Sequence, residues 1–196
     1  MKLLFAAAII IIIIVAIAIS VDFSNVTIES ESKRAGRRGE VVATNAIKGV
    51  LRDGDLLFTN VEISYNDRPT ELDNVVVNQY GVFIIEVKNY KGHLYGTEDD
   101  YEWKKYKDDG YGNTFEKNVK NPIKQVKRQI YILAKYLDYY GSRVWVDGYV
   151  LLIHGNSPVQ SGYVLSSIQD IDRAIHTPGR NCLSKQQTEA ISNLLQ

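Results

Sequence analysis

Two alternating apolar segments joined by a short turn constrain the fold of this chain most. Residues 71–77 (ELDNVVV) and 82–88 (VFIIEVK) have the composition of strands, and residues 78–81 (NQYG) are typical of a tight turn. Side chains alternate between the two faces of a strand, so a hairpin of this kind has one defined register. The sequence therefore predicts an antiparallel β-hairpin over residues 71–88.

The predicted register places charged side chains opposite each other. Counting back from the turn pairs Val77 with Val82, Val75 with Ile84, Asp73 with Glu86 and Glu71 with Lys88. Two directly opposed carboxylates destabilise a strand pair unless a cation lies between them. The hairpin therefore predicts a cation site, provided that no bulge in the turn shifts the register by one residue.

The remaining pattern is that of an α/β domain with a mixed sheet flanked by helices. An apolar stripe at helical spacing predicts a helix over 38–52, and Asn121-Pro122 has the chemistry of a helix start, with Gly141 as the stop. The other expected elements are strands at 55–64, 144–155 and 163–167, a hairpin near Gly110 within 93–120, and a terminal helix capped by Ser184.

The first 21 residues are not globular in character. Residues 3–19 form a run of 17 apolar residues, which just reaches the length of a membrane span. We expect an anchor over 1–21, with a cleaved signal peptide as the alternative, a polar tether over 22–33 and the domain over 34–196. Basic residues after the tether favour a single-pass membrane protein with a cytoplasmic domain, and a secreted or outward-facing domain remains the alternative.

Asp73, Glu86 and Lys88 together have the form of a phosphodiester-cleaving site. Two converging carboxylates supply the hard oxygen ligands that Mg²⁺ or Mn²⁺ prefers, and a nearby Lys stabilises charge on the phosphate. Glu40 lies on the inward stripe of the first expected helix, and Gln125 lies beside the apolar seam of the helix after Pro122. We therefore expect catalytic roles for these five residues and metal binding by Asp73 and Glu86.

Nucleic-acid contact requires local positive charge, because the 23 basic and 23 acidic residues balance. The interleaved aromatic and basic residues at 103–107 could stack bases and hold phosphates. A solvated surface is the alternative for all these groups, and membrane headgroups are a further alternative for the arginines near the tether. The candidate nucleic-acid-binding residues are Arg37, Arg38, Lys104, Lys105, Lys124 and Arg128.

Several stretches resemble the nuclease-related domain group of the PD-(D/E)XK nuclease superfamily. They are GRRGE (36–40), residues 71–96, Trp103 and NPIKQVKRQ (121–129). The resemblance implies a restriction-endonuclease-like fold, in which Asp73, Glu86 and Lys88 match the core motif. It also matches Glu40 to a helical acid and Gln125 to a glutamine of the following helix. The chain departs from the family at Asn74, where a His often follows the Asp.

These observations predict a membrane-anchored, metal-dependent nuclease that hydrolyses phosphodiester bonds, in DNA rather than RNA. The sequence has no Walker-type phosphate loop, no G-x-S-x-G elbow and no Cys or His pairs at zinc spacing, which excludes the common alternatives. The remaining alternative is a non-catalytic module of the same fold that binds nucleic acid, a protein partner or the membrane surface. Retention of the charged residues favours catalysis.

Overall fold

The computed structural model describes residues 31–108, 110–111, 113–178 and 182–196. The predicted anchor, residues 1–21, and most of the tether lie outside this part of the chain. No helix within the described residues is long and apolar enough to cross a membrane. Residues Ala35–Gln196 form one compact unit.

The unit is built on a five-stranded mixed sheet in the order β1-β2-β3-β7-β8. Strands β1 (Leu56–Tyr65), β2 (Arg68–Asn78) and β3 (Gly81–Lys88) are antiparallel to one another. Strand β7 (Val146–Leu152) runs parallel to β3, and β8 (Val164–Leu165) runs parallel to β7. The predicted mixed sheet is therefore confirmed.

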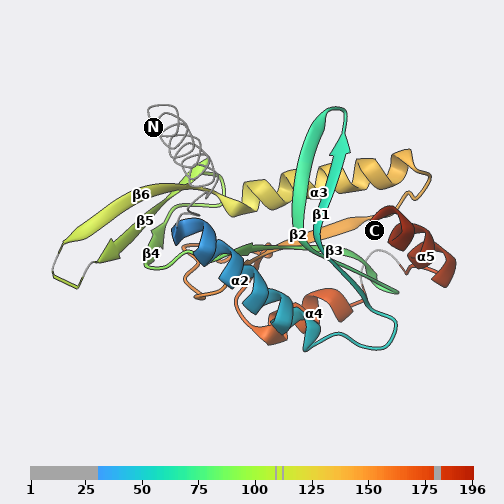
Figure 1. The fold of residues 1–196 in the computed structure, drawn as a ribbon, viewed down its shortest axis with the longest axis horizontal. Helices are drawn as coiled ribbons and strands as arrows, with labels where there is room; N and C mark the ends of the chain where they lie inside the picture. The colour runs from blue at the N-terminus through green and yellow to red at the C-terminus, as the bar shows by residue number, and fades with distance from the viewer. Residues whose placement is uncertain (1–30, 109, 112, 179–181) are drawn as a thin grey trace, which may run out of the picture. The chain divides into compact units, whose positions relative to one another are not determined.

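Helices cover both faces of this sheet (Figure 1). Helices α2 (Glu31–Lys48) and α4 (Ile168–His176) pack on one face, through a core that includes Ile47, Phe83, Ile85 and Ile175. Helix α3 (Pro122–Tyr139) packs on the other face, in a core that also takes Ile191 from α5 (Lys185–Leu194). Alternate residues of β2 and β3 therefore enter two separate cores.

Helix α2 differs from its prediction at both ends. It begins at Glu31 rather than at 38, and it ends at Lys48 rather than at 52. The early start reflects the good helix formers between Glu31 and Arg38, which have no apolar stripe and resemble a tether in sequence. The chain turns at Gly49, and the last two residues of the expected stripe, Val50 and Leu51, pack against the core from outside the helix.

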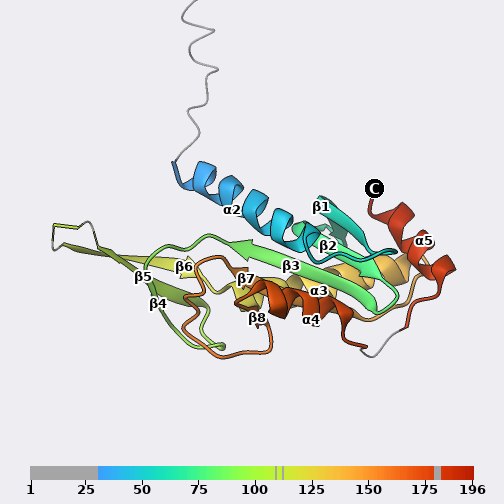
Figure 2. The ribbon, with the colours of Figure 1, turned by 90° about the horizontal axis from the view of Figure 1, so that it is seen from below.

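A second sheet fills the region in which the sequence predicts only a hairpin. Strands β4 (His93–Tyr95), β5 (Glu102–Asp108) and β6 (Thr114–Lys120) are antiparallel in that order, and they project beyond the main sheet (Figures 1 and 2). Trp103 on β5 is fully buried, and its indole N–H donates to the Thr97 carbonyl at 2.8 Å. The expectation that the aromatic residues of 103–107 stack bases is therefore wrong for Trp103.

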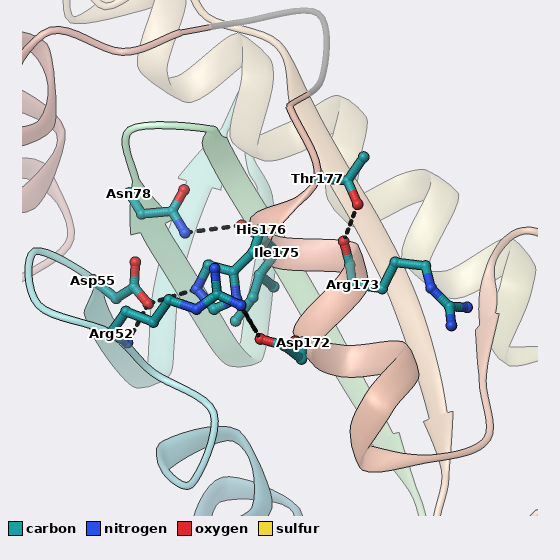
Figure 3. A network of polar contacts seen from close by, with 8 residues as sticks. All are labelled: Arg52, Asp55, Asn78, Asp172, Arg173, Ile175, His176 and Thr177. Carbon is teal, nitrogen blue, oxygen red and sulfur yellow. Dashed lines mark hydrogen bonds and ion pairs between the residues drawn. The ribbon is translucent and has the colours of Figure 1, made fainter.

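A buried histidine joins helix α4 to the turn before β1 (Figure 3). His176 Nε2 lies 2.8 Å from Asp55 Oδ2, and His176 Nδ1 lies 2.7 Å from Asp172 Oδ1. The hydrogen bond with His176 lowers the pKa of Asp172, which also pairs with Arg52 at 2.8 Å. This network holds α4 near the turn between β2 and β3, at the opposite end of β3 from Glu86 and Lys88, where Asn78 also donates to the Ile175 carbonyl at 2.9 Å. The two carboxylate partners explain why an imidazole is buried there.

Candidate active site

The predicted hairpin register is confirmed up to the point where the charged residues begin. Val77 pairs with Val82 and Val75 pairs with Ile84, as the turn geometry predicts. The pairing stops there, so the expected continuation to Asp73 opposite Glu86 is wrong as a backbone pairing. The backbone N–H of Val87 donates instead to Asp73 Oδ2 at 2.7 Å. The two strands separate because a side chain takes the place of a backbone acceptor.

Glu86 is a buried carboxylate held by three donors. Its side chain is 2% exposed. Lys88 Nζ and Gln125 Nε2 donate to Oε1, the latter at 2.6 Å, and Gln129 Nε2 donates to Oε2 at 2.6 Å. Gln125 and Gln129 lie four residues apart on one face of α3, so two consecutive helical turns reach the same carboxylate. The structure therefore brings together Glu86, Lys88 and Gln125, as the sequence predicts.

Gln129 is the residue whose role the sequence analysis missed. Its amide also donates to the Glu71 carbonyl at 3.0 Å, so it connects the separated end of β2 to Glu86. Its Oε1 is buried and has no hydrogen-bond partner within the described part of the chain. Spacing was the available signal, since a second glutamine at i+4 from Gln125 must share its helical face. An acceptor in this position suits a bound water molecule.

Asp73 has the most strongly shifted pKa in the site. Burial, with the negative charge of Glu86 as the next contribution, raises the pKa of Asp73 from 3.8 to about 7. The Val87 N–H and the Lys88 ammonium oppose this shift, and Glu40 adds to it. Burial would lower the pKa of Lys88, yet the adjacent Glu86 carboxylate raises it. The site therefore holds a cationic Lys and more negative charge than that one ammonium balances.

Glu40 reaches this region from the opposite layer of the fold. Helix α2 approaches the strand ends closely at Gly39, where an added Cβ would lie 2.8 Å from atoms of Asn89 and Ile153. Asn89, directly after β3, also donates to the Ala35 carbonyl of α2 at 2.7 Å. This close approach brings Glu40 near enough to act electrostatically on Asp73. It makes Glu40 a peripheral member of the charged cluster.

Asn74 lies on the other face of β2 from Asp73. It is fully buried, accepts a hydrogen bond from Thr44 Oγ1 of α2 at 2.8 Å, and donates to the Ile85 carbonyl at 3.5 Å. Its contacts therefore hold α2 against the sheet. Among the residues that the structure describes, Asn74 therefore takes part in the contact with α2 and makes none of the hydrogen bonds to the Glu86 carboxylate.

The donor set fits a hard divalent cation. One oxygen of Asp73 accepts from Val87, and Glu86 Oε2 accepts from Gln129, so lone pairs remain on both carboxylates. Within the described ranges, no group of three or more His, Cys, Asp or Glu side chains is arranged to hold a metal. Two carboxylates without a full protein cage suit Mg²⁺ or Mn²⁺, which retain water and phosphate ligands, better than Zn²⁺.

The predicted nucleic-acid-binding residues fall in three places. Arg37 and Arg38 are exposed on α2, and Lys124 and Arg128 are exposed on α3, where Arg128 also donates to the Pro69 carbonyl at 3.4 Å. Lys104 and Lys105 are neighbours on β5 and point to opposite faces of its sheet. Lys104 pairs with Glu116 at 2.8 Å. The structure therefore separates this last pair.

Comparison with known proteins identifies the family of this chain. The model of the nuclease-related domain (NERD) family matches residues 35–153, which include most of α2, the β2–β3 hairpin and α3. An uncharacterized protein of Bacillus anthracis is 28% identical over 109 residues, which cover 53% of this chain and 51% of that protein. The chain thus spans about half the length of the curated relative it matches. No solved structure matches the chain. Because the family model covers more than half of its residues, the chain belongs to the nuclease-related domain family.

Proposed function

We propose that this protein is a metal-dependent nuclease that hydrolyses phosphodiester bonds, in DNA rather than RNA. The observation that carries the proposal is the paired acids, Asp73 and Glu86, beside the ammonium of Lys88. Membership of the nuclease-related domain family agrees with it. Burial and the charge of Glu86 disfavour the ionised form of Asp73, whose pKa is about 7. A divalent cation between the two carboxylates would stabilise their negative charge.

Each residue of the site has a distinct part in this proposal. Asp73 and Glu86 would hold Mg²⁺ or Mn²⁺, which when bound polarises the phosphodiester and lowers the pKa of a coordinated water. Lys88 has three N–H donors and uses one on Glu86, so two remain for a phosphate oxygen that gains charge. Gln125 and Gln129 fix the orientation of the Glu86 carboxylate. Glu40 would orient a water at the edge of the site.

Cleavage assays with and without metal test this proposal directly. The full chain, purified in detergent, is incubated with linear DNA, circular DNA or RNA in Mg²⁺, in Mn²⁺ or in EDTA. We expect cleavage with either metal and none in EDTA, with DNA cut faster than RNA. Cutting of the circular form distinguishes endonucleolytic from exonucleolytic action. Equal cleavage in metal and in EDTA would sink the metal-dependent mechanism.

The second candidate function is nucleic-acid binding without catalysis. The three donors to Glu86 favour it to a limited extent, because they occupy both oxygens and make the carboxylate structurally satisfied. A binding module has no need for Asp73, however, whose charge is unfavourable next to Glu86. Binding of DNA with no cleavage in any metal would support this second candidate.

We propose further that residues 3–19 anchor the protein in a membrane as a single pass, with the domain on the cytoplasmic side. The 17 apolar residues and the basic residues that follow the tether motivate this proposal. The full chain is expected to remain in the membrane fraction after alkaline carbonate washing, whereas residues 22–196 alone are expected in the supernatant. Release of the full chain by carbonate would refute the anchor.

A further inference from the structure

The hairpin of β5 and β6 distributes its charges unequally between its two faces. On one face, Lys104 Nζ lies 2.8 Å from Glu116 Oε1, and the Tyr106 hydroxyl donates to Glu116 Oε2 at 2.6 Å. Further along the same face, Asn118 donates to Glu102 at 3.2 Å and Thr114 donates to Asp108 at 2.8 Å. Each of the three carboxylates on this face therefore accepts a hydrogen bond from a side chain of the same face.

The other face of the hairpin carries positive charge. Its innermost pair, Trp103 opposite Val119, packs in the core on the α3 side of the main sheet. The next pairs outward are Lys105 opposite Lys117 and Lys107 opposite Phe115. We name these four outer residues the basic face. None of its four strand positions holds a carboxylate, and Phe115 is 59% exposed.

The pairing of Lys105 with Lys117 is unfavourable in the protein alone. Directly opposed side chains in an antiparallel pair have Cβ atoms about 4.5–5.5 Å apart, and like charges at that separation destabilise the sheet. Burial lowers the pKa of Lys105, and the charges of Lys117 and Lys107 add to this effect. The repulsion between the two lysines costs stability, and the strand positions of this face supply no acid to offset it. An anion from outside the protein would therefore bind favourably here.

Tyr90 lies between the basic face and the candidate active site in the chain of contacts. Lys105 Nζ lies 5.8 Å from the centroid of the Tyr90 ring. Tyr90 follows Lys88 by two residues, and burial raises its pKa, with Lys88 and Glu86 acting in opposite directions on it. The inner end of the same hairpin face and the site residues adjoin one core, on the α3 side of the sheet. Tyr90 therefore lies close to Lys105 of the basic face and within electrostatic range of Lys88 and Glu86 in the site.

We propose that the basic face binds the sugar–phosphate backbone of a nucleic-acid strand beside the active site, with Phe115 stacking on an unpaired base. The inference rests on the proposed function, because it assigns a second surface to the same substrate. Lysines on alternate residues of one strand are about 6–7 Å apart and can follow a phosphate chain. An exposed aromatic ring beside them is the arrangement that holds single strands without sequence preference.

Binding in EDTA tests this assignment without cleavage. The probe is a fluorescein-labelled single-stranded oligonucleotide of about 30 nucleotides, titrated with the full chain in detergent. Replacing Lys105, Lys107 and Lys117 by Gln is expected to weaken binding about 10- to 100-fold and to reduce the slope of log K against log [salt] by about 2. Phe115→Ala is expected to weaken binding about 5- to 100-fold with no change in that slope.

A charge-matched variant controls for the loss of three positive charges. Replacing Lys48, Lys120 and Lys185 by Gln removes the same charge from α2, from the opposite hairpin face and from α5, where Lys185 is 92% exposed. It is expected to change affinity less than threefold. The Tm shows whether each variant folds. Relief of the Lys105–Lys117 repulsion is expected to raise the Tm of the basic-face variant, whereas the Tm of the control variant is not expected to rise.

Two outcomes overturn the assignment. One is an oligonucleotide affinity equal in the basic-face and control variants. The other is a basic-face variant that binds the oligonucleotide normally and loses only its preference for phosphatidylserine over phosphatidylcholine vesicles, which would make the face a membrane contact. Failure of the nuclease proposal is distinguishable, since the wild-type chain would then cleave nothing in metal while binding in EDTA still depended on the basic face.

Discussion

Asp73→Asn is expected to lower metal-dependent cleavage about 10³-fold, equivalent to about 4 kcal/mol of transition-state stabilisation. The substitution removes one of the two proposed metal ligands and leaves the shape of the side chain unchanged. An amide oxygen can still accept the hydrogen bond from the Val87 N–H, so the separated strand ends keep their contact. Initial rates of cleavage across a Mn²⁺ titration measure the effect.

The same substitution is expected to stabilise the metal-free protein at alkaline pH. Asp73 has a pKa of about 7 in the folded chain against 3.8 as its ordinary value, so the folded state binds more protons between these values. The free energy of unfolding of the wild type therefore falls as pH rises from about 4 to about 7, by about 2–4 kcal/mol in total. The amide introduced by Asp73→Asn does not titrate, so at pH 8 the variant is expected to exceed the wild type by that amount.

At pH 8, bound metal is expected to make the wild type more stable than Asp73→Asn. A cation that binds only the folded wild type raises its stability according to concentration, and it does so only once Asp73 has lost its proton. Urea denaturation at pH 5 and pH 8, with Mn²⁺ or EDTA, measures all four conditions. Asp138→Asn, an exposed change on α3, is the matched control and is expected to follow the wild type. An Asp73→Asn protein with the wild-type pH profile would contradict the charge assignment.

The parts of the site that depend on local patterns could be predicted from the sequence. The turn at 78–81 determines the register as far as Val75 and Ile84, and Asn121 caps α3 through a 2.9 Å hydrogen bond from the Ile123 N–H. The end of the strand pairing could not be predicted, because it arises when the Asp73 carboxylate takes the Val87 N–H. The role of Gln129 likewise depends on how α3 lies across the sheet.

The sequence predicts a hairpin near Gly110, but the extent of the second sheet could not be predicted, for a different reason. Strands β5 and β6 are polar on both faces, and only their inner ends reach the core, at Trp103 and Val119. Such strands show little of the apolar alternation on which strand prediction depends. The same property separates Lys104 from Lys105, since neighbours in sequence lie on opposite faces once the segment is known to be a strand.

Lys88→Met is expected to have the opposite stability effect from Asp73→Asn and a similar effect on cleavage. Among the described residues, the Lys88 ammonium is the one cationic donor to Glu86, whose side chain is 2% exposed. Removing it leaves a buried carboxylate with two neutral amide donors, which is expected to cost about 3–5 kcal/mol of unfolding free energy. Cleavage is expected to fall about 10²- to 10³-fold, because the ammonium no longer stabilises charge on the phosphate.

Metal distinguishes the two variants. Without its ammonium, the Asp73 and Glu86 pair carries more uncompensated negative charge, so Mn²⁺ is expected to restore stability to Lys88→Met while cleavage stays low. Asp73→Asn is expected to gain no stability from Mn²⁺. Lys91→Met, an exposed change in the loop after β3, controls for the loss of a lysine and is expected to match the wild type. An ammonium that acts on the transition state contributes far more than a factor of about five in rate. If Lys88→Met cleaves within about fivefold of the wild-type rate, Lys88 is therefore only a structural partner of Glu86 and has no part in the chemistry.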